Sequence, residues 1–198
     1  KFENDPYGRN FLGTPPQGKA DFAFFQHILK SMNPNTGRCA ILFPHGILFR
    51  QDESNLRKKL IESDLIECII GAAKGLFYNS PMEACIVICR MRKTPEMQGK
   101  IKFIQAKNLY VKDGTHNNLS DSNIQLIKDA YVNKYDVSGL TKVVDNETLL
   151  SNESKLLISL YVESKGKINE LSLGEQYELW VASSIKCYEE ISQFLGGN

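Results

Sequence analysis

Residues 38–46, RCAILFPHG, decide how the rest of the chain is interpreted. Five apolar residues in a row, 39–43, show no alternation with polar residues, which is typical of a strand covered on both faces. Pro44, His45 and Gly46 follow at once and predict a loop at the carboxyl end of that strand. In an open parallel sheet ligands bind at this end of the strands, so the loop is the first candidate site.

Two more apolar runs follow, LIECII at residues 65–70 and ACIVIC at residues 84–89, and they predict two further buried strands. No helix fits into the roughly dozen residues between them, and a connection of that length favours antiparallel pairing over a helical crossover. The alternating stretch KIKFI, residues 100–104, predicts an edge strand. The chain is therefore expected to be an α/β protein.

Helices are expected on either side of these strands. Phe22, Phe25, Leu29 and Met32 form one helical stripe that begins near Asp21, and Gly37 follows its end. Residues 137–150 predict an irregular connection. Further helices are expected at residues 52–63, 120–135, 154–162 and 173–195.

The composition sets the class of protein. The 198 residues, 42% of them hydrophobic, can form one domain, or one domain with an appendage. None of the five cysteines has the spacing of a zinc site, so we expect no metal, and thiols kept reduced in the cytoplasm. No signal peptide or membrane span is expected. A start at Lys1 instead of Met suggests a chain that begins inside a longer protein.

Charge is distributed unevenly although the net charge is only +1. Residues 90–112 carry seven Lys or Arg and one Glu, and they predict either contacts to DNA phosphates or a charged strand edge that prevents aggregation. Residues 163–198 carry six Glu and three Lys, so a helix there is expected to pack on protein, either its own domain or a partner. The candidate phosphate contacts are Arg90, Arg92, Lys93, Lys100 and Lys102.

Four long blocks in a fixed order carry a resemblance to a known family: KADFAFFQHIL, NPNTGRCAILFPHGILFR, LRKKLIESDLIECIIG and LFYNSPMEACIVICR. Together with LLSNESKLLISLYV they resemble the modification subunit of type I restriction-modification systems, an adenine-specific DNA methyltransferase family that uses S-adenosylmethionine. The resemblance implies part of a Rossmann-like methyltransferase sheet followed by a helical carboxyl-terminal tail. It also implies a site-specific transfer of a methyl group to adenine N6 in DNA.

The family's catalytic tetrapeptide, Asn-Pro-Pro-Phe or Asn-Pro-Pro-Tyr, leaves two alternatives open here. Asn4, Asp5, Pro6 and Tyr7 resemble it, with Asp in place of the first Pro and no apolar strand before it. The same residues also resemble a loop that lies just downstream of the tetrapeptide in relatives, which is the interpretation we favour. It implies that the tetrapeptide and most of the cofactor site precede Lys1, and the chain indeed has no glycine-rich phosphate or dinucleotide motif. The chain alone is then expected to be inactive.

The base pocket is expected at two loops. Phe77, Tyr78 and Asn79 lie in the loop before the third strand, and in similar enzymes an aromatic residue of this loop packs on the flipped base. The alternative is that these residues form a hydrophobic plug under the sheet. Pro44, His45 and Gly46 would border the same pocket, or simply form a turn.

We therefore expect residues 1–112 to be the carboxyl-terminal half of a catalytic domain and residues 113–198 a mostly helical segment that contacts other subunits. The resemblance implies DNA, a specificity subunit and a restriction subunit as partners. The alternative function is a non-catalytic DNA-binding or scaffold module derived from a methyltransferase.

Overall fold

The computed structural model describes residues 4–77, 80–114, 116–133 and 135–163. Its compact unit, Lys1–Ser164, contains a five-stranded sheet and a two-stranded hairpin, so the boundary expected at residue 112 falls inside this unit. The helix expected at residues 173–195 lies outside the described residues. Among the described residues, no helix is both long and apolar enough to cross a membrane.

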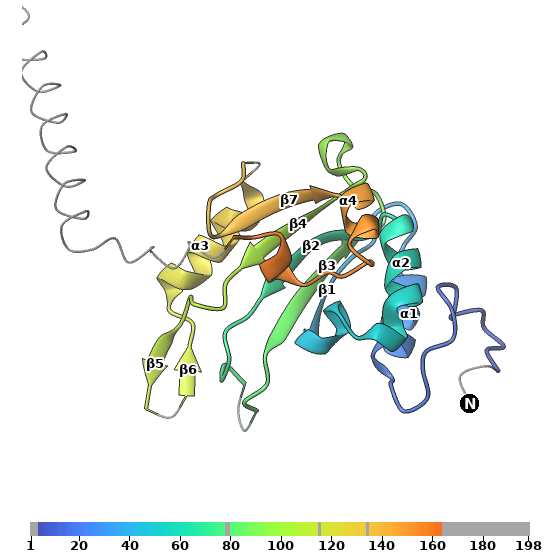
Figure 1. Cartoon of the computed structure of the whole chain (residues 1–198), viewed down its shortest axis with the longest axis horizontal. Coiled ribbons are helices and arrows are strands. Elements are labelled where there is room, and N and C mark those ends of the chain that lie inside the picture. The colour runs from blue at the N-terminus through green and yellow to red at the C-terminus, as the bar shows by residue number, and fades with distance from the viewer. Residues whose placement is uncertain (1–3, 78–79, 115, 134, 164–198) are drawn as a thin grey trace, which may run out of the picture. The chain divides into compact units, whose positions relative to one another are not determined.

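The main sheet has the strand order β1-β3-β2-β4-β7. β3 is antiparallel to both β1 and β2, β4 is parallel to β2, and β7 is antiparallel to β4. β1, β2 and β4 therefore run in the same direction, as Figure 1 shows. Their bounds are β1 Arg38–Pro44, β2 Ile66–Gly71, β3 Ala84–Arg90, β4 Lys100–Gln105 and β7 Thr141–Asp145.

Helices cover both faces of this sheet. The main core packs under α1 (Asp21–Ser31), α2 (Ser54–Glu62) and α4 (Asn146–Ser151), and a smaller cluster packs under α3 (Asp121–Val132). Figure 1 shows α1 and α2 at one side of the sheet and α3 at the other. Phe22, Phe25 and Leu29 are buried, which confirms the apolar stripe predicted for α1.

Local sequence explains where several helices begin. Ser120 Oγ accepts the backbone N–H of Asn123 at the start of α3, and Asp145 Oδ1 accepts the N–H of Thr148 at the start of α4. Short 3₁₀ turns, η1 (His45–Leu48) and η2 (Gln51–Glu53), separate β1 from α2. Two more such turns are η3, Pro95–Met97, and η4, Ile158–Leu160.

Four expectations about elements were wrong. Residues 100–104 are not an edge strand, because β4 lies between β2 and β7 and most of its side chains are buried. Residues 137–150 are not irregular, since they hold β7 and α4. Only the 3₁₀ turn η4 forms where a helix was expected at residues 154–162. β1 is not covered on both faces, because it lies at the sheet edge and Ala40 and Leu42 are exposed.

The expected antiparallel pairing of the second and third strands is confirmed, with Ile69 opposite Val87. β3 also pairs with β1, so it lies between two strands that precede it in the chain. The hairpin of β5 (Val111–Asp113) and β6 (His116–Asn118) projects from the same side of the sheet as the loop of residues 72–83 (Figure 1).

Candidate functional site

The carboxyl ends of β1, β2 and β4 meet at one edge of the sheet, because the three strands are parallel. β3 begins at this edge, so Glu83 also lies there. A cavity of about 120 Å³ opens at the edge. It is lined by His45, Gly71, Ala72, Glu83, Gln105, Lys107, Ile158 and Ser159.

His45 is held in this cavity by Glu83. Its backbone N–H donates to the Glu83 carbonyl oxygen at 3.0 Å, and its Nδ1 lies 3.8 Å from Glu83 Oε2. Burial of the ring lowers the pKa of His45 below its usual value, and this outweighs the opposing effect of the Glu83 carboxylate. The lowered pKa favours the neutral imidazole, which can donate one hydrogen bond and accept another without adding a charge.

Two exposed lysines, Lys74 and Lys107, supply positive charge at this edge. Lys74 Nζ lies 3.3 Å from Glu83 Oε1, and Lys107 lines the cavity. The sequence alone did not indicate Glu83 or Lys74, and it included Lys107 only as a member of the basic stretch of residues 90–112. Lys107 lies two residues after the end of β4, so the rule about carboxyl ends would have indicated it if the direction of β4 had been known.

The predicted turn after the first strand is confirmed and is tightly built. Pro44 is the last residue of β1, opposite Ala84. The carbonyl oxygen of Gly46 accepts the N–H groups of Phe49 and Arg50 at 3.1 and 3.0 Å. A Cβ at Gly46 would lie 2.7 Å from Arg50 Nε, so a side chain there would displace Arg50.

The loop of residues 72–83 carries the second predicted group. Phe77 is half-buried and forms an isolated bridge with Ser80, whose N–H donates to the Phe77 carbonyl oxygen at 3.1 Å. Tyr78 and Asn79 lie outside the described residues. Asn117 of β6 holds the start of this loop, since its Nδ2 donates to Lys74 O at 2.7 Å and its backbone N–H donates to Gly75 O at 3.1 Å.

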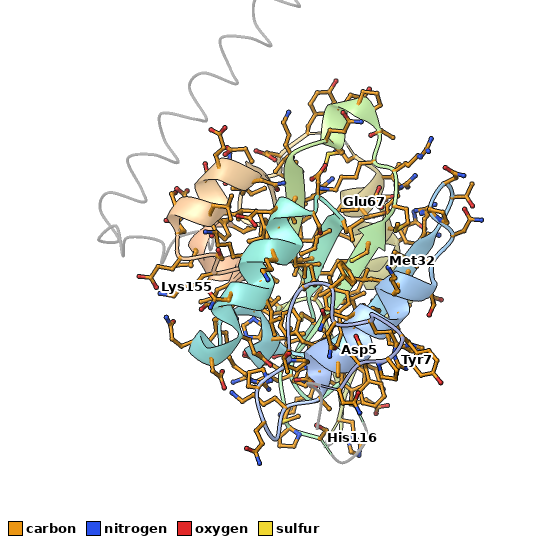
Figure 2. The ribbon with its side chains drawn as sticks, turned by 90° about the vertical axis from the view of Figure 1, so that its right-hand side faces the viewer. Asp5, Tyr7, Met32, Glu67, His116 and Lys155 are labelled. Carbon is orange, nitrogen blue, oxygen red and sulfur yellow. The ribbon has the colours of Figure 1, made fainter. Side chains whose placement is uncertain are left out.

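The amino-terminal candidates Asn4, Pro6 and Tyr7 lie in a separate place. Figure 2 shows Asp5 and Tyr7 in the loop beside α1. Asn4 and Asp5 line a different cavity, of about 520 Å³, together with residues of α1. The structure therefore does not bring these residues and His45 into one cavity.

Asp5 shapes this loop. Its Oδ2 accepts the backbone N–H of Asn10 at 2.6 Å, and this bond is the main reason that the pKa of Asp5 is lowered. The guanidinium of Arg9 lies 4.8 Å from the centre of the Tyr7 ring, which is 74% exposed.

Three of the five candidate phosphate contacts already bind protein groups. Arg90 Nε lies 2.9 Å from Glu67 Oε1, and the buried Lys93 Nζ lies 2.6 Å from Asp64 Oδ1. Lys102 is buried and its Nζ donates to the carbonyl oxygen of Asn133, past the end of α3. Burial lowers the pKa values of Lys93 and Lys102. These contacts argue against a phosphate role for the three residues.

Arg92 and Lys100 are exposed, but they lie just after β3 and at the start of β4. That is the opposite edge of the sheet from His45. Lys100 lines a cavity of about 680 Å³ there, together with Glu67, Arg90 and Tyr131. Tyr131 donates its hydroxyl hydrogen to Glu67 Oε2 at 2.9 Å, and its oxygen accepts from Arg38 at 3.1 Å.

Within the described part of the chain, no cluster of His, Cys, Asp or Glu could hold a metal ion.

Comparison with known proteins places this geometry in context. Residues 1–170 match the family model described as N-6 DNA Methylase. The chain is 38% identical over 180 residues to the type I restriction enzyme MjaVIII methylase subunit of Methanocaldococcus jannaschii, covering 88% of this chain and 31% of that protein. It is 34% identical to the MjaVII methylase subunit of the same organism, covering 93% of this chain and 32% of that protein. The chain thus spans about a third of the length of the curated relatives that it matches.

Solved structures give the same picture. A type I restriction-modification methyltransferase subunit from Streptococcus thermophilus is similar with a TM-score of 0.75 at 31% identity, over 82% of this chain and 34% of that chain. The M protein of the type I restriction enzyme EcoKI shares the fold with a TM-score of 0.62 at 13% identity, over 93% of this chain and 46% of that chain.

Proposed function

We propose that this chain, which belongs to the N-6 DNA methylase family, is the carboxyl-terminal portion of the catalytic domain of a type I DNA methyltransferase subunit. The whole enzyme would transfer a methyl group from S-adenosylmethionine to adenine N6 at a specific DNA site. Two facts support this proposal. Type I restriction enzyme methylase subunits match most of the chain, and the chain spans about a third of their length.

The observation that carries the proposal is that β1 is an apolar strand at the edge of the described sheet. This strand is apolar, yet it pairs only with β3 among the described strands and leaves Ala40 and Leu42 exposed, Leu42 by 48%. An apolar strand with an unpaired edge is a liability that proteins normally cover. We propose that strands from an upstream part of the same protein pair with β1 and complete a Rossmann-like sheet.

The carboxyl edge of the described sheet would then be one wall of the base pocket. Pro44, His45 and Gly46 would border it, as would Asn79, and Phe77 or Tyr78 would supply an aromatic surface for a base flipped out of the duplex. A base stacked on an aromatic side chain gains about 1–3 kcal/mol. The neutral His45 would offer a hydrogen bond there without a competing charge.

The cofactor site would lie mostly outside this chain. Binding sites for small molecules have volumes of about 300–1,000 Å³, whereas the cavity at the carboxyl edge has about 120 Å³. We therefore propose that the carboxyl edge of this chain does not enclose S-adenosylmethionine by itself. On the interpretation that we favour, Asn4, Pro6 and Tyr7 belong to the loop after the catalytic tetrapeptide, and the tetrapeptide is upstream.

For DNA, we propose a phosphate contact at Lys107, which is exposed at the same edge as His45. Lys74 is exposed there too, but it would have to leave its ion pair with Glu83 to bind a phosphate. As further partners we propose the specificity and restriction subunits of the same system. The acidic residues 163–198, which from residue 164 on lie outside the described part, would contribute to that assembly.

Co-expression tests the proposal. The chain, the upstream segment of the same protein and the specificity subunit are produced together from separate genes. Methylation of adenine N6 in DNA is then measured. We expect methylation only when both segments are present. If the paired segments assemble but never methylate, and no intact Asn-Pro-Pro-aromatic sequence occurs upstream, the non-catalytic scaffold is the correct alternative.

A further inference from the structure

Two cysteines face each other across neighbouring strands. Cys39 of β1 and Cys89 of β3 are direct partners in the antiparallel register, so their side chains lie on the same face of the sheet. Both pack into the main core, where Cys89 is fully buried and Cys39 is partly exposed. Both are free thiols.

The backbone places the pair at a disulfide-compatible distance. The N–H of Met91 donates to Gly37 O at 2.9 Å, and the N–H of His45 donates to Glu83 O at 3.0 Å. In an antiparallel ladder, hydrogen-bonded and non-hydrogen-bonded residue pairs alternate. The Cys39–Cys89 pair lies two residues from the first of these bonded pairs and six from the second in the same register, so it is a hydrogen-bonded pair as well. Such positions have Cα atoms about 5.5 Å apart, within the range of about 4.4–6.8 Å that disulfides require.

The surroundings favour reaction at Cys39. A hydrogen bond from the Cys89 thiol lowers the pKa of Cys39 to about 7, so a large share is thiolate at neutral pH. The same interaction and burial raise the pKa of Cys89, which stays a thiol. Cys85 offers an internal comparison: it lies on the same strand and face, but its cross-strand partner is Phe43 and burial raises its pKa to about 12.

We propose that Cys39 and Cys89 form a reversible cross-strand disulfide when a peroxide oxidises the protein. The Cys39 thiolate attacks one peroxide oxygen and the O–O bond breaks, giving a sulfenic acid on Cys39 and hydroxide or alkoxide. The sulfur of Cys89 then attacks the Cys39 sulfur. The S–S bond forms as hydroxide leaves, and it takes up the Cys89 proton as water. Two thiols are oxidised by two electrons, and the peroxide is reduced by two.

The disulfide would join β1 to β3. At the candidate site, His45 follows the end of β1 and Glu83 precedes the start of β3. It would fasten the edge strand without needing any catalytic activity, so the inference does not depend on the proposed methyltransferase function.

Peptide mapping tests the inference. The reduced full chain is treated with hydrogen peroxide in its folded state, remaining thiols are blocked with N-ethylmaleimide, and tryptic peptides are identified by mass spectrometry. We expect a link between the peptide of residues 39–50 and the peptide of residues 75–90, located by fragmentation to Cys39 and Cys89, and lost after dithiothreitol. The Cys85→Ser variant should keep the link, and Cys89→Ser should lose it.

Three results would overturn the inference. The first is a linked peptide that uses Cys85 or Cys187 instead of Cys89. The second is Cys39 oxidised to sulfinic acid while Cys89 remains a free thiol. The third is no consumption of Cys39 and Cys89 until the protein is unfolded. The wild-type map decides between these results even if a variant fails to fold.

Discussion

The side-chain amide of Asn117 donates a hydrogen bond of 2.7 Å to the carbonyl oxygen of Lys74. The backbone N–H of Asn117 donates a second bond, to Gly75, at 3.1 Å. A residue of the β5–β6 hairpin thus fixes the start of the loop that carries Phe77. Gly75 adopts a φ of +68°, a conformation that favours glycine, so the turn held by Asn117 has little freedom to change its sequence.

We predict that Asn117→Ala slows methylation by the complete enzyme by several-fold to about tenfold, because one hydrogen bond that positions the loop is lost. The measurement is single-turnover methylation of a DNA duplex. Asn118→Ala is the matched control, since Asn118 Nδ2 donates to Asp113 Oδ2 within the hairpin. Equal losses in both variants would show that hairpin stability, and not loop position, is responsible.

Lys107→Ala should weaken DNA binding at every sequence and reduce the slope of log K against log salt by about 1, because one phosphate contact would be lost. Fluorescence anisotropy across a salt series measures the slope. Arg92→Ala is the control, since Arg92 is exposed at the opposite edge of the sheet. A reduced slope for Arg92→Ala alone would place the DNA at that other edge.

Arg57→Met should destabilise the fold by about 2–4 kcal/mol, because buried carbonyl groups would lose their donor. Arg57 is 1% exposed; its Nε donates to Ser154 O at 3.1 Å and its Nη1 donates to Arg50 O at 2.6 Å. Urea unfolding provides the measurement. Lys58→Met, next in sequence on α2 but exposed, should change stability by about 0.5 kcal/mol or less. Similar losses for the two variants would contradict this role of Arg57.

Glu53→Gln should become more stabilising as the pH rises. Glu53 is fully buried, neither of its carboxylate oxygens accepts a hydrogen bond from the described residues, and burial raises its pKa. The folded state therefore holds the proton to higher pH than the unfolded state does, and the wild type loses stability as the pH climbs from the ordinary carboxyl pKa through the raised one. The variant has no such loss.

Urea unfolding of both proteins at about pH 4 and about pH 7 checks this expectation. The difference in unfolding free energy, variant minus wild type, should be more positive at the higher pH. A difference that stays constant, or that falls, would mean that Arg50, whose Nη1 lies 3.6 Å from Glu53 Oε1, holds the carboxylate charged in the fold.

The sequence predicted elements whose cause is local. Apolar runs, interrupted only by Glu67 in β2, identified β1, β2 and β3, and the absence of a helix between the last two predicted their antiparallel pairing correctly. The helix expected at residues 120–135 forms as α3, with Ser120 at its start. The turn at Pro44 to Gly46 followed from residue types alone.

The errors arose where distant pairing decides the structure. β7, TKVVD, is short and flanked by polar residues, and it forms by pairing with β4, which also makes β4 an internal strand. Lys102 alternates like an exposed residue but is buried, because the carbonyl group of Asn133 binds its ammonium. The cavity residues Glu83 and Lys107 lie just before β3 and just after β4, so their proximity could be recognised only once the order and direction of the strands were known.

Isothermal titration calorimetry with S-adenosylmethionine tests the central claim, that this chain supplies one side of a catalytic domain whose cofactor site needs the upstream segment. We predict no binding heat for the chain alone and clear binding once the upstream segment is assembled with it. Tight binding of S-adenosylmethionine to the chain alone would contradict the claim.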